Sequence, residues 1–222
     1  FTQGAPIPEA LDADEMQNIK QNFVNAAKRA VRLGFSAIEL HGAHGYLIHE
    51  FISPISNQRE DEFGGSLDNR LKFPLEIFDE VRKVVPSDIA LGLRLTGTDW
   101  RDDGLSVEDA KNVAKSFEAH GADYLCISSG GITTGLKIPV GPNYQVHLAK
   151  GIKDVVSIPV RAVGLITTAE QANDIILNGE ADMVALARAF LANPRWGWDA
   201  SVALQQPIEV PPQYERAYKV PQ

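Results

Sequence analysis

The sequence is poor in three features that mark whole classes of protein. It has one cysteine, Cys126, which excludes a disulfide framework and any zinc or iron–sulfur site built from four cysteines of this chain. It has no uninterrupted run of about 18 apolar residues, so no membrane span is expected. Basic residues are outnumbered, 21 against 29 acidic ones, and the net charge of -8 argues against nucleic acid or an anionic membrane as the main partner.

A secretory signal is also missing from the sequence. Residues 1–6 contain no basic stretch followed by an apolar one. The composition, 44% hydrophobic and 23% charged, is that of an ordinary globular protein. We therefore expect a reducing, cytoplasmic setting, in which a local basic pocket for a phosphate is still allowed because net charge does not describe a single site.

Helices and strands are predicted to alternate over residues 12–204, between an N-terminal loop (1–11) and a proline-rich tail (205–222). Residues 47–65 are predicted to form a long polar connection, and a loop of that length is usually functional. Short apolar runs predict strands at 37–43, 89–96, 123–128, 160–166 and 183–186. Helices are predicted to begin at Asp12 or Asp14, Ser66, Ser106, Val146, Thr167 or Thr168, and Asn193.

A helix followed by five strand–helix units requires parallel strands with right-handed crossovers. An open doubly wound sheet and a (β/α) barrel both fit this alternation. Polar or glycine residues stand at the end of nearly every strand, and the barrel face is where enzymes of that fold carry their chemistry. These strand-end residues therefore favour the barrel. They are His41, Arg94, Ser128, Gly164 and Arg188.

The stretch from Ala37 to Tyr46 carries the densest chemistry. Apolar and polar residues alternate up to Leu40, as in a short strand, and glycines then break the run. His41, His44 and Tyr46 fall within six residues at that break. Each alone is as easily a packed or capping residue, but three proton-donating groups together at a strand end indicate an active site.

A phosphate site is predicted at the last two strands. Gly164 ends one of them, and Ala187 and Arg188 end the other. Small residues let backbone N–H groups approach a phosphate, and an arginine supplies a charged fork. The alternative is a tight turn beside a surface arginine. No P-loop and no complete G-x-G-x-x-G fingerprint occurs, so a mononucleotide on a barrel is favoured over a Rossmann dinucleotide.

These residues belong to a longer pattern. It runs from His41-Gly42-Ala43-His44-Gly45-Tyr46 through Ser53-Pro54 to Asn57-x-Arg59 and Asn69-Arg70, and continues at Arg94, Ser128-Ser129-Gly130, Ala162-Val163-Gly164 and Ala187-Arg188. The pattern spans residues 12–204 and resembles the old yellow enzyme family of FMN-dependent ene-reductases. The double-histidine form is similar to the bacterial NADPH dehydrogenase and xenobiotic reductase branch.

The resemblance implies a (β/α)8 TIM barrel that binds FMN and uses NADPH or NADH to reduce activated alkenes, enones first and nitro compounds second. His41 and His44 would hydrogen-bond the substrate oxygen, which stabilises the developing enolate charge. Tyr46 would donate a proton to the α-carbon. Arg94 would lie beside the flavin pyrimidine edge. The other cofactor-binding residues implied are Ser129, Gly130, Val163, Gly164, Ala187 and Arg188.

The resemblance also implies contacts with other chains. Similar proteins send a C-terminal arginine or aromatic residue into the neighbouring subunit's active site, so Arg216 or Tyr218 would complete a substrate pocket in a homodimer or larger oligomer. The five predicted strands correspond to the fourth through eighth of the barrel. A complete barrel has eight strands and typically about 250 residues. We therefore expect a second polypeptide of about 100–150 residues to supply strands one to three.

Two other classes of function are weighed against this one. A metal-dependent hydrolase would use His41, His44 and His49 as ligands, but no carboxylate stands at a convincing ligand spacing, and we predict no metal site. A non-catalytic or incomplete barrel subunit, needing a second chain to bind flavin, is the other alternative. The intact set of His41, His44, Tyr46 and Arg94 argues for the enzyme.

Overall fold

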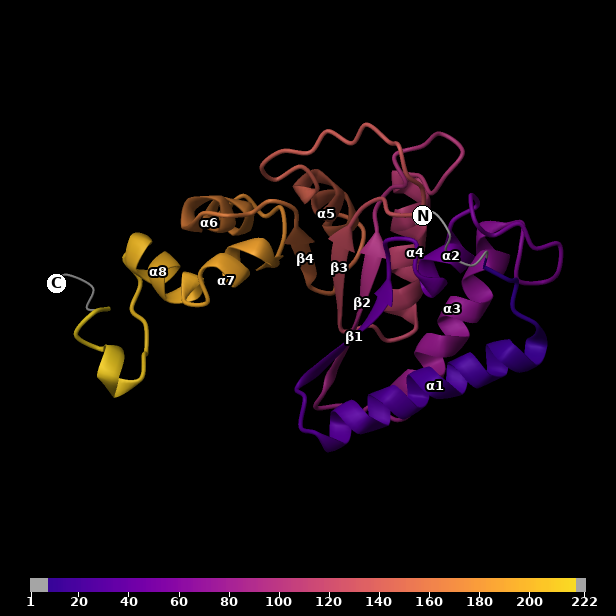
Figure 1. Ribbon diagram of the computed structural model, residues 1–222, viewed down its shortest axis with the longest axis horizontal. Helices are drawn as coiled ribbons and strands as arrows, with labels where there is room; N and C mark the ends of the chain where they lie inside the picture. Colours follow the sequence, from indigo (N-terminus) through magenta and orange to yellow (C-terminus); the bar gives the residue numbers. More distant parts are fainter. Residues whose placement is uncertain (1–7, 219–222) are drawn as a thin grey trace.

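Helices and parallel strands alternate in the computed structural model, which describes residues 8–218 (Figure 1). The strands are β1 (Ala37–Gly42), β2 (Ala90–Thr96), β3 (Tyr124–Ser128), β4 (Val160–Val163) and β5 (Met183–Ala185). The helices are α1 (Ala13–Arg32), α2 (Leu47–Ile52), α3 (Leu67–Arg82), α4 (Val107–Ala119), α5 (Val146–Lys153), α6 (Ala169–Leu177), α7 (Arg188–Ala192) and α8 (Trp196–Ala203), followed by a 3-10 turn, η1 (Pro212–Tyr214).

The five strands form one parallel sheet in the order β1-β2-β3-β4-β5, which is their order in the sequence. The register pairs His41 with Arg94, Arg94 with Cys126, and Cys126 with Arg161, so these four residues form one row across the sheet. A doubly wound sheet reverses its strand order at a switch point. This sheet does not, so its topology is that of a segment of a (β/α) barrel.

Side-chain caps explain why the helices begin close to where the sequence predicts. The Asp12 carboxylate accepts the Glu15 N–H at 2.8 Å, and the Glu15 carboxylate accepts the Asp12 N–H at 2.9 Å. This reciprocal pair, a capping box, satisfies two N–H groups that the first helical turn leaves free. Ser106 and Thr168 begin α4 and α6 in the same way, and Ser66 caps α3 through the N–H of Asn69.

The main core lies between the outer face of the sheet and the helices. Phe78 of α3 and Phe117 of α4 are fully buried there, with ring centres 5.3 Å apart in an edge-on contact. Alternate strand residues point into this layer and are fully buried. They include Leu91, Leu93, Leu95, Leu125 and Ile127.

The inner face of the sheet is polar at its centre. Arg161 of β4 forms an ion pair with Glu39 of β1, three strands away. The Arg161 guanidinium also lies 5.2 Å from the centre of the Tyr124 ring. That ring fits because Gly92 has no side chain, since a Cβ there would lie 2.4 Å from it. These contacts tie the first described strand to the fourth across the concave side.

The structure corrects the predicted elements in three places. Within the predicted connection 47–65, residues 47–52 form α2, because Ile48, Phe51 and Ile52 give the segment an apolar side that is buried. Strand β4 ends at Val163 instead of residue 166, since Gly164 turns the chain with a φ of +131°. A short helix, α7, follows β5 before the helix predicted from Asn193.

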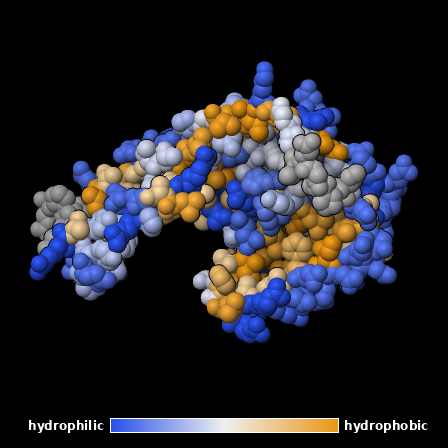
Figure 2. Space-filling model, viewed as in Figure 1, coloured by the Kyte–Doolittle hydropathy of each residue, from blue (hydrophilic) through white to orange (hydrophobic). Residues whose placement is uncertain are grey.

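The molecule is open on one side. Figure 2 shows a deep indentation between the C-terminal helices and the α1 side, where apolar surface gathers. Leu33 and Phe35, after α1, are 72% and 58% exposed, and Leu177 and Leu191, near the other sheet edge, are 75% and 83% exposed. Within residues 8–218, no helix has the length and apolarity that crossing a bilayer requires.

Candidate functional site

The carboxyl ends of the parallel strands meet at one edge of the sheet, and a cavity of about 260 Å³ opens there. It extends over the loops that follow β3, β4 and β5. Residues predicted from distant parts of the sequence line this one cavity. They are His44, Arg94, Ser129, Val163, Gly164, Ala187 and Arg188. A second cavity of about 250 Å³, beside residues 8–11, contains none of the predicted residues.

The histidine and tyrosine side chains cluster after β1, as predicted. The ring centres of His41 and His44 are 5.2 Å apart, and those of His41 and Tyr46 are 5.0 Å apart. Tyr46 is 62% exposed. The three groups can therefore meet one small molecule that enters from the open side of the sheet.

A tight turn over residues 43–46 presents His44 and Tyr46 next to His41, which is near the end of β1. The N–H of Tyr46 donates to the carbonyl of Ala43 at 3.2 Å. His44 and Gly45, at the two central positions, have φ values of 60° and 75°, the pattern of a type I′ turn. Gly45 cannot be replaced here, because a Cβ would lie 2.4 Å from the carbonyl oxygen of Gly131.

His44 is linked to the neighbouring strand by Ser128. The His44 Nε2 lies 2.7 Å from the Ser128 hydroxyl, and the His44 N–H donates to the Thr96 hydroxyl at 3.2 Å. The Ser128 hydroxyl lies 3.3 Å from the amide oxygen of Gln145, to which it can donate. If it does so, Nε2 carries the hydrogen toward Ser128, and otherwise the hydrogen is on Nδ1. The Ser128 hydroxyl thus governs whether Nδ1 of His44 is available to a ligand as a donor or as an acceptor.

The site lowers the basicity of both imidazoles. Burial, and then the positive charge of Arg94, lower the pKa of His44 to about 4. The same two causes, burial first, lower the pKa of His41. His44 is therefore a neutral imidazole near pH 7, which can offer one N–H as a hydrogen-bond donor.

Arg94 has the properties expected of a residue that holds a cofactor. It lines the cavity, and its Nε is buried with no hydrogen-bond partner among residues 8–218. An unpaired buried donor costs about 1–3 kcal/mol, which an acceptor in the cavity would recover. The ring oxygens and nitrogens of a flavin are acceptors of this kind. The residues present therefore fit the cofactor that the resemblance implies.

The glycine of the predicted phosphate loop is pressed against a residue that the sequence reasoning missed. A Cβ on Gly164 would lie 2.9 Å from the Gln145 amide nitrogen. Gln145 is buried, accepts the Ser129 hydroxyl at 2.5 Å and donates to the Val163 carbonyl at 3.2 Å. It connects the loops after β3 and β4. No local motif marks a glutamine at a helix start as part of a site, so the sequence offered no signal for it.

Five predicted residues are outside the lining of the cavity: His41 and Tyr46, which cluster beside His44, and Gly130, Arg216 and Tyr218. Gly130 faces the loop above it, where a Cβ would lie 3.3 Å from Ile138 and 3.4 Å from Trp100. Arg216 is exposed, and the Tyr218 ring packs edge-on against Trp198 at 5.2 Å. Within this chain the tail thus folds against α8, away from the strand ends.

His49, the third ligand of the metal-site alternative, is not available to a metal ion. Both ring nitrogens of His49 are engaged elsewhere, Nδ1 by the N–H of Gly45 at 2.9 Å and Nε2 by Asp99 at 3.0 Å. Over the described range, no group of three or more His, Cys, Asp or Glu side chains is placed to hold a metal ion.

Comparison with known proteins places this geometry in a family. The model of the NADH:flavin oxidoreductase / NADH oxidase family matches residues 1–206. NADPH dehydrogenase of Geobacillus thermodenitrificans is 42% identical over 219 residues, which are 99% of this chain and 64% of that protein. NADPH dehydrogenase of Bacillus subtilis is 40% identical over 218 residues, again covering 64% of its length. The chain thus spans less than two thirds of these relatives.

Solved structures agree with the partial coverage. A 2-naphthoyl-CoA reductase complex superposes with a TM-score of 0.81 at 28% identity, over 90% of this chain and 31% of the other. Morphinone reductase superposes with a TM-score of 0.73 at 28% identity, over 94% of this chain and 54% of the other. The predicted barrel segment and the resemblance to old yellow enzyme are both confirmed. The chain belongs to the NADH:flavin oxidoreductase / NADH oxidase family.

Proposed function

We propose that the whole protein is an FMN-dependent NAD(P)H oxidoreductase that reduces activated alkenes, with enones as the main substrates and nitro compounds as a second class. The observation that carries the proposal is the cluster formed by the end of β1 and the turn 43–46, where two imidazoles lie 5.2 Å apart beside a phenol. Reducing a polarised alkene requires donors for the substrate oxygen and an acid for the α-carbon. The relatives named NADPH dehydrogenase support NADPH or NADH as the reductant.

The chain's own residues have separable roles in this proposal. His41 and His44 each donate one N–H to the substrate oxygen. Neutral His44 does so from Nδ1, in the tautomer whose Nε2 accepts the Ser128 hydroxyl, and its bond strengthens as negative charge develops on the substrate oxygen. Tyr46 donates the proton to the α-carbon from the exposed side of the cluster.

Bound FMN supplies the hydride chemistry. Arg94 would hold the pyrimidine edge of the ring with its Nε, which has no partner in the described part of the chain. The Gly164 and Ala187 backbone and the Arg188 guanidinium would hold the phosphate, since all three line the same cavity. The remaining residues assigned to FMN are Ser129, Gly130 and Val163.

We also propose that a second polypeptide of about 100–150 residues completes the barrel with its first three strands. The exposed Leu33 and Phe35 support this, as does the length of the relatives. Denaturing gels and intact mass of the yellow protein should show a second species. A single 24.2 kDa chain that binds FMN tightly and turns over enones would contradict it.

The C-terminal tail supports a proposed contact between subunits of a homodimer. The Tyr218 ring packs against Trp198 and anchors the tail on α8. Arg216, two residues earlier, is exposed, so its side chain is available to a neighbouring subunit. We propose that Arg216 or Tyr218 completes a substrate pocket in the neighbouring subunit. The cytoplasmic location of the protein also stays a prediction.

The decisive experiment is a flavin release assay on the purified protein, followed by NADPH oxidation with 2-cyclohexenone. Released FMN together with enone-dependent turnover supports the proposal. FMN without turnover would identify a non-catalytic barrel subunit instead. Protein that purifies in its complete assembly without flavin would refute the FMN assignment.

A further inference from the structure

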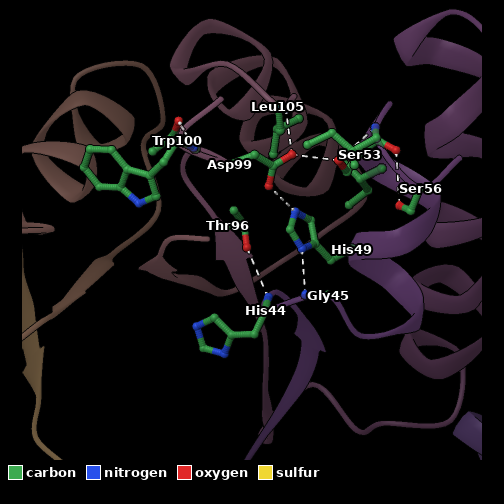
Figure 3. Close-up of polar contacts among 12 residues, drawn as sticks. His44, Gly45, His49, Ser53, Ser56, Thr96, Asp99, Trp100 and Leu105 are labelled. Carbon is green, nitrogen blue, oxygen red and sulfur yellow. Dashed lines mark hydrogen bonds and ion pairs between the residues drawn. The ribbon is translucent and has the colours of Figure 1, made fainter. Parts of the chain in front are cut away.

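His49 is buried directly behind the turn that carries the candidate catalytic groups. It does not line the cavity, and both its side chain and that of Asp99 are fully buried. Figure 3 shows His49 between the Gly45 backbone on one side and the Asp99 carboxylate on the other. The Gly45 N–H donates to Nδ1 at 2.9 Å, and Nε2 lies 3.0 Å from Asp99 Oδ1.

This arrangement permits one protonation state. Because the Gly45 N–H is a donor, Nδ1 of His49 must present its lone pair, and the ring hydrogen is then on Nε2. Nε2 and Asp99 Oδ1 are 3.0 Å apart in an ion-pair contact whose angle is outside hydrogen-bond geometry, and neither has a hydrogen-bond partner among the described residues, so each is the nearest group that can satisfy the other. The other carboxylate oxygen of Asp99 accepts the Ser53 hydroxyl and the Leu105 N–H, each at 2.7 Å.

Asp99 is held as the carboxylate that this tautomer needs. Burial by itself would raise the pKa of Asp99, but hydrogen bonds from His49, Ser53 and Leu105 together hold that pKa below its usual value. The negative charge then keeps the Nε2 hydrogen pointed at Asp99, and the lone pair of Nδ1 pointed at Gly45.

The turn needs such a support. His44 is a non-glycine residue with a φ of 60°, a conformation that persists only when surrounding contacts hold it. The N–H of His44 is held by Thr96 and that of Tyr46 by Ala43. The N–H of Gly45 between them is held by His49. Without that acceptor, the Gly45 N–H has no partner, and the peptide joining His44 to Gly45 loses the hydrogen bond that fixes its orientation.

We propose that His49, oriented by Asp99, is a positioning residue that locks the turn 43–46 so that His44 faces the oxygen of a bound ligand while Tyr46 faces the carbon to be protonated. The ligand class is a molecule with a phenolate or enolate-like oxygen. This inference rests on the proposed function, because it concerns how that same site recognises its ligand.

Two isosteric variants of the flavin-loaded protein test the proposal. In His49→Asn, the amide oxygen takes the place of Nδ1 and can still accept the Gly45 N–H. In His49→Gln, the longer amide reaches the place of Nε2 and still meets Asp99, but leaves Gly45 without an acceptor. We expect His49→Gln to bind a phenol, measured by the charge-transfer absorbance of p-hydroxybenzaldehyde, about tenfold or more weakly, and His49→Asn within about threefold of wild type.

The two variants separate positioning from general destabilisation. FMN content and Tm serve as controls, and a His49→Gln variant that binds the phenol as well as wild type overturns the proposal. Equal losses in both variants, in step with their Tm values, also overturn it. If wild type itself binds no phenol and reduces no enone, the proposed function fails instead.

A measurement on the wild-type protein does not depend on how the variants fold. In ¹⁵N-histidine NMR spectra of the folded protein, His49 should be protonated at Nε2 and unprotonated at Nδ1, the tautomer that accepts the Gly45 N–H. Protonation at Nδ1 would overturn the proposal, because Gly45 could not then donate to it.

If His49→Gln does not fold, Ser53→Ala removes one donor to Asp99 and should weaken phenol binding about threefold. Unchanged binding in Ser53→Ala, together with Nδ1 protonation, overturns the proposal, and Nε2 protonation with weaker binding supports it.

Discussion

Replacing Gly164 with alanine tests the predicted phosphate loop at a single atom. Gly164 follows β4, lines the cavity, and has a φ of +131°, which only glycine adopts readily. The added Cβ would lie 2.9 Å from the Gln145 amide nitrogen and 3.2 Å from its Cβ. Either the loop or Gln145 must move.

The cost follows from what holds each partner in place. A non-glycine residue in such a backbone conformation costs about 1–3 kcal/mol. Gln145 is buried and bonded to Ser128, Ser129 and the Val163 carbonyl, and each bond lost costs about 0.5–1.5 kcal/mol. With one of these bonds lost, the sum is about 1.5–4.5 kcal/mol. If the loop shifts to relieve this strain, that energy is taken from FMN binding, which weakens about tenfold or more.

Fluorescence titration of the apoprotein with FMN measures this loss, and thermal unfolding measures any loss of stability. Gly179→Ala is the matched control, since Gly179 also has a positive φ, +67°, but a Cβ there meets nothing within 4 Å and the residue is outside the cavity. It should cost about 1 kcal/mol of stability and leave FMN affinity unchanged. A Gly164→Ala protein that binds FMN within about threefold of wild type would refute the assignment of this loop.

Four further predictions concern the catalytic turn and the tail. His41→Ala or His44→Ala should weaken phenol binding and slow alkene reduction far more than flavin reduction by NADPH. Each lost donor should raise the activation free energy of alkene reduction by about 2.7–4 kcal/mol. Equal slowing of both half-reactions would contradict the assignment. Tyr46→Phe should leave phenol binding intact and slow only the protonation step, seen by solvent isotope effects in stopped flow; weaker phenol binding would point to another role. The pKa of His44 is about 4 in the folded protein and 6.5 in the unfolded chain. Between these values the unfolded chain binds a proton that the folded protein does not, so lowering the pH favours unfolding. The free energy of unfolding should therefore be fully retained above pH 6.5 and should decrease as the pH falls toward 4. Thermal unfolding from pH 7 to pH 4 should show this loss, and His44→Gln should reduce it. Deletion after Gln206 should raise KM and weaken the dimer, and an unchanged dimer and KM would exclude a role for the tail in a partner's pocket.

Local sequence patterns were sufficient for most elements and for the gathering of several candidate site residues at the strand ends. Caps such as Asp12, Ser106 and Thr168 act within four residues, and buried strands appear as short apolar runs, so both are visible in the chain. His41, His44, Tyr46 and the glycine loops could be predicted because strand ends of a parallel sheet meet at one edge. The choice of a barrel over a doubly wound sheet also came from residues at those ends.

Contacts between distant segments were decided only by the tertiary structure. Gln145 joins two loops through bonds to Ser129 and Val163, and nothing near it in the sequence marks it. His49 was weighed as a metal ligand, yet it is paired with Asp99, 50 residues away, behind the turn. The sequence by itself determined which groups gather at the strand ends, because that depends on periodicity and chain order. Only the packed structure determined their orientation and protonation, because these depend on which buried donors and acceptors meet across the fold.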